Sequence, residues 1–280
     1  MKPHLQTNPM INRLSLNLSP QNRKTQIIPM RKDNNMRNIW TIAVREYKHY
    51  FTSAIAYAFA FGILLILGVL FYITLLQSTM SQQAPGIDAV VGPLVTLLLF
   101  TTPALTMRSL AEEQKMGTLE LLLTSPVRDY EVVVGKWLAG WGFLITVLLI
   151  TWAYPLILNQ IISPGIDQGS MVAAYLGLFL MTAVFVAIGV AVSSFFSNQI
   201  AAFFLSIGII LILWIIGYGA SASSNSGAFS EILRFLDMSD HFYGSFYRGI
   251  VELKSVIYYI SMTIFALVIG SVSIEARRWR

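Results

Sequence analysis

Six apolar segments of membrane-spanning length constrain what this chain can fold into. None of them contains an Asp, Glu, Lys, Arg or His residue. A helix of about 20 apolar residues crosses a hydrocarbon core of about 30 Å and satisfies its own backbone hydrogen bonds. We therefore expect an all-α, polytopic integral membrane protein with about six transmembrane helices, five or seven being the alternatives. The predicted spans are Ile55–Leu76, Val90–Thr106, Trp137–Leu158, Met171–Phe195, Ile200–Tyr218 and Val256–Ile274.

The composition agrees with a membrane domain and narrows the possible chemistry. Of 280 residues, 55% are hydrophobic and 12% are charged, about half the charged fraction of a soluble domain. The absence of Cys excludes disulfides and thiolate catalysis. No predicted span carries an ionisable side chain that could serve as an ion or proton site. The free energy for any transport would therefore have to come from a partner.

Two spans contain prolines, and another contains regularly spaced small residues. Pro93 and Pro103 predict a kinked or partly re-entrant second span, and Pro155 lies near one end of the third. In the fourth span, small residues recur at four-residue spacing, which allows close approach of helices. These residues are Ala183, Ala187 and Ala191, with Gly189 and Ser193.

The distribution of basic residues predicts the orientation of the chain. Nine Lys and Arg residues precede the first span, four lie in residues 107–136 and three follow the last span. The other side carries only Arg234, Arg248 and Lys254. Because cytoplasmic loops are enriched in Lys and Arg, both termini are expected in the cytoplasm. The net charge of +5 is then a topology signal and a contact for membrane lipid, so no nucleic-acid partner is expected.

The chain before the first span has two parts. Residues 1–35 are rich in Asn, Gln, Ser and Pro, which predicts a disordered or spurious tail, with Met36 as an alternative start. Residues 36–54 predict an amphipathic helix in the membrane interface; a cytoplasmic extension of the first span is the alternative. Its apolar face would carry Ile39, Trp40, Ala43, Val44, Tyr47 and Phe51, and its polar face Arg45, Glu46, Lys48 and His49.

The longest charged interruption of the apolar sequence is residues 107–136. Ser109–Met116 favours a helix, Gly117 breaks it, and Thr118–Thr124 resumes as an apolar stretch with Glu120 facing outward. Ser125-Pro126 ends that stretch. A short helix with an apolar face, held under the membrane by two spans, suits docking into a groove of another protein. The alternative is that it packs against its own membrane leaflet.

Sequence motifs for catalysis are scarce. Gly135-Lys136 lacks the upstream Gly of a phosphate-binding loop, since that position is Tyr130. No HExxH motif occurs, and His4, His49 and His241 are isolated in the sequence. The segment 219–255 is first rich in small polar residues and then in aromatic ones, which predicts interfacial helices that dip into the outer leaflet. The rings expected in the lipid interface are Phe229, Phe235, Phe242, Tyr243, Phe246 and Tyr247. Within the same segment, Asp237, Asp240 and His241 leave a metal-dependent membrane enzyme open as an alternative.

Two stretches resemble a known family. Glu112–Pro126 (EEQKMGTLELLLTSP) is similar to the loop between the second and third spans of ABC-2 type transporter permeases. The matching positions are Glu113, Gly117, Thr118, Glu120, Leu122, Pro126, Gly135 and Lys136. Ser239–Tyr259 resembles the gliding-motility branch of that family through His241, Phe242, Phe246, Arg248, Gly249 and Ile250. Glu252-Leu253-Lys254-Ser255 departs from the Asp-rich run typical of that branch.

The resemblance covers residues 36–280 and implies a permease domain of an exporter in the bacterial plasma membrane. Such a subunit pairs with a second permease protomer and with a cytoplasmic ABC ATPase that binds ATP and Mg, so no cofactor or metal is expected here and the chain is no enzyme itself. The resemblance implies ATPase coupling through Glu112, Glu113, Gly117, Thr118 and Glu120. It implies an interface helix with Trp40, Arg45, Glu46 and Tyr47. It also implies an extracytoplasmic loop at 219–255 with the motif His241, Phe242, Phe246, Arg248 and Gly249. A membrane anchor that docks a partner without transport stays the alternative function.

Overall fold

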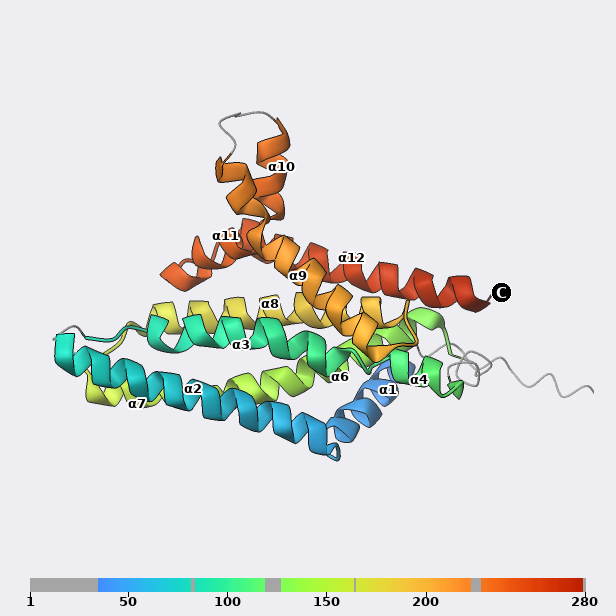
Figure 1. The fold of residues 1–280 in the computed structure, drawn as a ribbon, viewed down its shortest axis with the longest axis horizontal. Coiled ribbons are helices and arrows are strands. Elements are labelled where there is room, and N and C mark those ends of the chain that lie inside the picture. The colour runs from blue at the N-terminus through green and yellow to red at the C-terminus, as the bar shows by residue number, and fades with distance from the viewer. Residues whose placement is uncertain (1–34, 82–83, 119–126, 164, 223–227, 279–280) are drawn as a thin grey trace, which may run out of the picture. The chain divides into compact units, whose positions relative to one another are not determined.

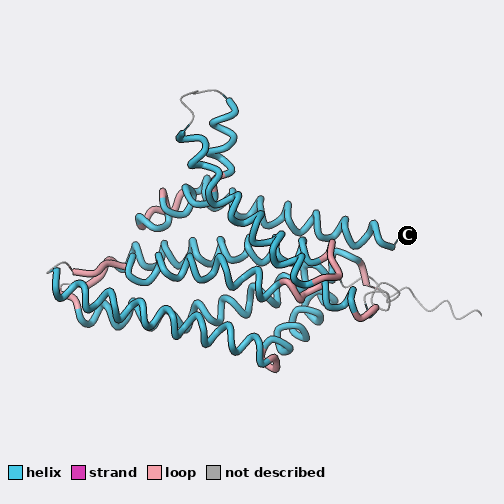
Figure 2. The backbone as a smooth tube through the Cα atoms, in the orientation of Figure 1, coloured by secondary structure: helices cyan, strands magenta, loops and turns pink. Residues whose placement is uncertain are grey.

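The described part of the chain is built from helices joined by short loops. The computed structural model describes residues 35–81, 84–118, 127–163, 165–222 and 228–278, in which no strand occurs. Figures 1 and 2 show the arrangement of the helices. In chain order these are α1 (Asn35–Tyr50), α2 (Ala54–Ser81), α3 (Asp88–Thr106), α4 (Ala111–Lys115), α6 (Asp129–Thr151), α7 (Ala153–Ile161), α8 (Gln168–Ser193), α9 (Gln199–Ala222), α10 (Ala228–Leu236), α11 (Met238–Tyr243), the 3₁₀ turn η3 (Phe246–Arg248) and α12 (Leu253–Arg278).

Six helical segments of the described residues are long and apolar enough to cross a membrane, which confirms the predicted fold class and number of spans. They are Ala54–Ser81, Asp88–Lys115, Asp129–Ile161, Gln168–Ser193, Gln199–Gly217 and Leu253–Arg277. The last eight residues of the predicted loop 107–136 are therefore helical, because α6 begins at Asp129. Residues 1–34 and 119–126, which include the predicted tail and Glu120, lie outside the described residues.

Prolines affect the two spans differently. α3 is a single helix from Asp88 to Thr106 although it contains Pro93 and Pro103, so it has no re-entrant turn. Each proline removes one backbone hydrogen bond, which a packed membrane helix tolerates. The third span instead divides into α6 and α7, which meet at Trp152. Pro155 has no N–H to donate to the carbonyl of Thr151, and the regular ladder ends there.

The spans connect the α4 end and the α11 end of the bundle (Figure 1), and these two ends differ in charge. The α4 end carries α1, α4 and the last turn of α12, and the α11 end carries α7, α10 and α11. At the α11 end, the described basic residues are Arg234, Arg248 and Lys254. At the α4 end they are Arg37, Arg45, Lys48, Arg108, Lys115, Arg128, Lys136, Arg277 and Arg278.

α8 is the central helix of the bundle. It is uncharged and apolar on all sides, which is typical of a helix that is covered all round. It packs against α3, α6, α9, α12 and η3. Its small residues give these neighbours room: Gly189 lies against Thr106 of α3, and Ala191 lies against Gly270 of α12. The small residues singled out in the sequence are thus part of the protein's own core.

Gly177 of α8 offers a direct test of this packing. A Cβ at this position would lie 2.6 Å from Cβ of Phe246 and 2.7 Å from its Cγ. We therefore expect Gly177→Ala to lower the free energy of unfolding by about 1–3 kcal/mol through overpacking. Thermal unfolding of the detergent-solubilised chain measures the effect. The matched control is Gly92→Ala in α3, where nothing lies within 4 Å; equal stability of the two variants would contradict the packing.

Candidate functional site

A chain of ion pairs connects three helices at the α4 end. The Lys136 ammonium, on α6, lies 2.8 Å from Oε1 of Glu113 on α4 and 3.3 Å from Oε2 of Glu46 on α1. Arg45 continues the chain at 2.8 Å from the other Glu46 oxygen. The Lys136 side chain is only 4% exposed, whereas both glutamates are 18% exposed. A lysine so deeply buried requires paired carboxylates, and here they come from two segments far apart in the sequence.

α1 lies on α6 because glycines leave space for it. A Cβ on Gly135 would lie 2.6 Å from Cγ2 of Ile42, so only glycine permits this approach of α1. The next contacts along α6 are aromatic: Tyr50 stacks on Phe143, with ring centroids 5.3 Å apart. The Tyr47 hydroxyl is 2.9 Å from Oγ1 of Thr146. Gly135 and Lys136 therefore act together, since one admits α1 and the other binds its carboxylate.

Glu131 fixes the beginning of α1 and was missed by the sequence analysis. It is buried, and its Oε2 accepts hydrogen bonds from the Arg128 backbone N–H (3.1 Å) and from Nδ2 of Asn38 (3.2 Å). The first of these bonds caps the N-terminus of α6, where the helix dipole favours a negatively charged carboxylate. Glu three residues after Arg128 is the one sequence signal that could have indicated this role.

The predicted residues of the interface helix divide into two groups. Trp40 is 67% exposed and Arg45 is also exposed, so both are on the outer surface of α1. Tyr47 and Glu46 instead face the bundle. The sequence placed Glu46 on the outward polar face, and the structure corrects this. Residue 46 lies seven positions, about two helical turns, after Ile39 and thus shares its inward face.

Gln114 joins α4 to the central helix. Its Nε2 donates to the carbonyl oxygens of Ser194 (2.7 Å) and Ser193 (3.3 Å) at the C-terminus of α8. The last carbonyls of a helix lack partners within the helix, and side-chain donors can satisfy them. From α12, Arg277 donates to the Phe195 carbonyl at 2.9 Å. Nothing in the sequence pattern marked Gln114, because its acceptors lie 79 and 80 residues further along the chain.

The described end of the predicted coupling segment is exposed. Lys115, Met116, Gly117 and Thr118 follow the tethered part of α4 and are all exposed. Gly117 has φ +70°, a left-handed conformation that favours glycine, and it ends the helical run as predicted. Glu112 is half-buried, and Glu113 is held by Lys136.

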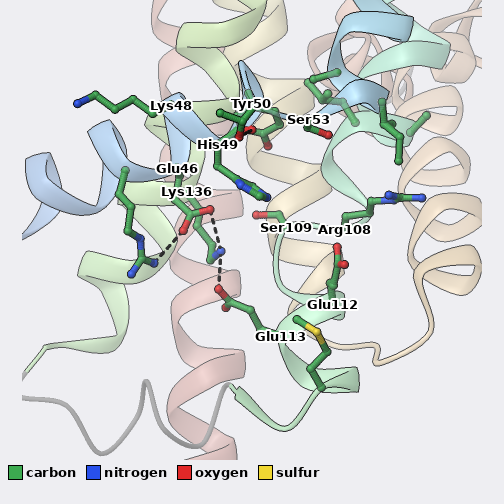
Figure 3. Close-up of a pocket in the computed structure, with 17 residues that line it drawn as sticks. Glu46, Lys48, His49, Tyr50, Ser53, Arg108, Ser109, Glu112, Glu113 and Lys136 are labelled. Carbon is green, nitrogen blue, oxygen red and sulfur yellow. Dashed lines mark hydrogen bonds and ion pairs between the residues drawn. The ribbon is translucent and has the colours of Figure 1, made fainter.

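A pocket of about 710 Å³ lies beside the ion pairs, between α1, α4 and the ends of α2 and α3. Figure 3 shows the side chains that line it. Burial alone would raise the pKa of Glu46, but Lys136 and Arg45 outweigh it and hold this pKa below its usual value of 4.5. Glu46 is therefore ionised at neutral pH.

At the α11 end, the predicted motif forms an internal anchor. Phe242 and Phe246 are fully buried, and Phe246 packs on Gly177 of α8. The prediction that these two rings lie in the lipid interface is therefore wrong. Arg248 is exposed beside Asp88 and Asp167 in a pocket of about 610 Å³. Gly249 has φ +79° and lies against Ser170.

His241 is part of this anchor. Its Nε2 lies 3.1 Å from the Phe235 carbonyl, and its Nδ1 lies 3.2 Å from the Ser255 hydroxyl. Burial lowers the pKa of His241, and the Phe235 carbonyl offsets part of the effect. Asp237 accepts from the Ser239 backbone N–H at 3.0 Å. Over the described residues, no three His, Asp or Glu side chains are placed to hold a metal ion together.

Removing the central cation should destabilise the α4 end. Lys136→Met leaves Glu113 without a counter-charge and Glu46 with only the exposed Arg45, and we expect a loss of about 3 kcal/mol in unfolding free energy. Adding Glu46→Gln and Glu113→Gln should restore much of it, since the only charge then left without its partner is the exposed Arg45. Thermal unfolding in detergent measures both variants. Lys115→Met, an exposed lysine of the same end, is the control; equal losses for the two lysines would refute the ion-pair chain.

The lowered pKa of Glu46 gives a pH prediction. Its stabilising effect should be complete above about pH 4.5, the unfolded value, and should disappear as the pH decreases through the lower folded pKa. The difference in melting temperature between the unmodified chain and Glu46→Gln should accordingly narrow below pH 4.5. A difference that stays constant across this range would mean that Glu46 is not held by Lys136.

The comparison with protein families places this geometry in context. Residues 40–242, from α1 to α11, match the family described as ABC-2 family transporter protein. No curated protein matches the sequence. The matched region contains the α1, α4 and α6 residues of the ion-pair chain and most of the six spans. Because the match extends over most of the chain, this multi-pass membrane protein belongs to the ABC-2 family of transporter proteins.

Proposed function

We propose that this chain is the permease subunit of an ATP-driven exporter whose ATP hydrolysis takes place on a separate cytoplasmic ABC ATPase. The family match carries the proposal. ATP and Mg would be bound by the partner, and the permease would contribute movement rather than catalysis. The α4 end would face the cytoplasm, in agreement with its excess of Lys and Arg over the α11 end.

The tethers of α4 support a mechanical role. Glu113 connects this short helix to α6 through Lys136, and Gln114 connects it to the C-terminus of α8. α8 in turn packs against four other spans or their ends. A displacement of α4 would therefore be passed to the central helix and its neighbours as a rigid-body movement.

The same tethers narrow the set of residues that would contact the ATPase. Because Glu113 is engaged internally, we assign it to transmission rather than to direct contact. The exposed residues Met116, Gly117 and Thr118 would form the contact surface together with the residues that follow, including Glu120. On α1, exposed Trp40 would lie in the membrane interface or against the partner.

The assembly would contain a second permease protomer in the bacterial plasma membrane. α2 and α9 are the least covered spans, with 17% and 22% of their apolar windows buried. Their free faces would contact lipid or the second protomer. The motif from His241 to Gly249 would assign the chain to the gliding-motility branch, with the motif holding α11 and η3 on α8.

Capture of the ATPase tests the proposal. Affinity purification of the unmodified chain in mild detergent should yield a soluble subunit with a GxxxxGK[ST] phosphate-binding loop. Met116→Glu should reduce the captured amount about tenfold, because a buried charge weakens a protein interface. The control is Met80→Glu, at the opposite end of α2, where Met80 is 85% exposed.

The alternative is a membrane anchor that docks a partner without transport. Failure to capture an ATPase in several detergents would favour the anchor and count against the exporter. Where an ATPase is captured, nucleotide-dependent transport by the reconstituted complex would distinguish the two functions.

A further inference from the structure

The pocket at the α4 end lies where a membrane span meets the charged interface. One wall is apolar and comes from the first turn of α2 (Ile55 and Ala56) and the last turn of α3 (Ala104 and Leu105). The other walls come from α1, α4 and Lys136. A cavity with apolar residues on the span side and charges on the other matches the depth of lipid headgroups and the upper acyl chain.

Most of the charges that line the pocket are already paired. Arg45, Glu46, Lys136 and Glu113 form the ion-pair chain described above. The Lys48 ammonium points away from the other labelled side chains in Figure 3. Of the remaining charged side chains, Arg108 and Glu112 form no ion pair within the described part of the chain.

Arg108 has unused donors in this pocket. Its Nε is buried and has no hydrogen-bond partner. Burying a donor without a partner costs about 1–3 kcal/mol, so a movement of the side chain that brings Nε to a bound acceptor would remove a penalty that the protein carries when the pocket is empty. A guanidinium presents several N–H groups in one plane and is well suited to a phosphate.

Glu112 places an opposite charge one helical turn away. Its backbone N–H donates to the Arg108 carbonyl at 3.3 Å, and residues four apart have Cβ atoms about 5–6 Å from each other. Figure 3 shows the two side chains next to each other at the pocket. Beside them, Oε2 of Glu113 is buried and also lacks a hydrogen-bond partner. The pocket is therefore lined by a cation and a carboxylate, Arg108 and Glu112, that form no ion pair within the described residues.

We propose that this pocket binds the headgroup of a zwitterionic phospholipid with a primary ammonium, a phosphoethanolamine lipid. Arg108 binds the phosphate, Glu112 accepts hydrogen bonds from the ammonium, and the apolar wall contacts the glycerol and first acyl carbons. A two-carbon link separates phosphate from ammonium in this headgroup, which suits two charges one helical turn apart. The site goes beyond the proposed transport function and does not depend on it.

Headgroup chemistry decides which lipid fits. The phosphate of a phosphatidylglycerol lipid can bind Arg108, but its headgroup has no positive charge to bind Glu112. A choline headgroup is positively charged but has no N–H to donate to the carboxylate oxygens. Only a primary ammonium supplies both charge and donors, so the ethanolamine lipid should bind more tightly than either.

The experiment is native mass spectrometry of the full chain in mild detergent with added short-chain phosphatidylethanolamine, phosphatidylcholine or phosphatidylglycerol. The unmodified chain should bind the ethanolamine lipid about tenfold more tightly than the other two. Glu112→Gln should abolish this preference and leave phosphatidylglycerol binding undiminished. Arg108→Gln should weaken all three lipids about tenfold, because charge-assisted hydrogen bonds to the common phosphate are lost. If Arg108→Gln is poorly folded, the preference lost in Glu112→Gln is decisive alone.

Lys115→Gln is the matched control. Lys115 lies on α4 like Glu112 and is positively charged like Arg108, but it does not line the pocket. This substitution should leave the lipid preference unchanged. Equal binding of the three headgroups by the unmodified chain would overturn the proposal. Competition by free phosphoethanolamine at equal concentration would overturn the lipid as the ligand.

Discussion

The Lys136 ammonium is the constraint on which the α4 end depends. It is buried near the beginning of α6, and a charge in that position requires carboxylates within a few ångströms. Glu46 and Glu113 supply them, so α1 and α4 can occupy only positions that bring both glutamates to one nitrogen. Gly135, the residue before Lys136, removes the steric obstacle to α1. Charge and close packing thus determine the same contact.

The two ends of the bundle are closed by different physical means. At the α4 end, ion pairs and the donors of Gln114 and Arg277 satisfy charges and helix carbonyls. At the α11 end, contacts between buried aromatic rings hold the helices together. His241, for example, stacks on Tyr258 at a centroid distance of 4.1 Å. Salt should therefore act mainly on the α4 end. Acid should act on both ends, because the pKa of Glu46 and the pKa of His241 are both lowered.

The sequence predicted the spans and their number because uncharged runs of membrane length have few other solutions. It failed where a side chain's position depends on a distant partner. Helical periodicity assigned Glu46 to the polar face of its helix with its charged neighbours. Its partner Lys136 lies 90 residues later, so the local pattern could not indicate the ion pair. Phe242 and Phe246 were predicted to be interfacial because they lie in an aromatic segment outside the spans. Phe246 in fact packs against Gly177, and this contact between distant residues leaves no pattern in the sequence. The residues named by resemblance were brought together only in part, since the α4 and α11 groups lie at opposite ends.

The lipid pocket and the proposed contact with the ATPase share α4. Glu112 would bind the headgroup, Glu113 and Gln114 tether the helix, and Met116 begins the surface offered to the partner. A lipid that binds one position of α4 more tightly than another must alter the affinity of the ATPase for that position by the same factor, because linkage between two binding sites is reciprocal. A lipid with equal affinity for both positions would alter nothing. The headgroup and the partner would act on the same five-residue helix. A movement of α4 that changed the geometry between Arg108 and Glu112 would alter the affinity for the lipid, and membrane composition would then be a determinant of coupling.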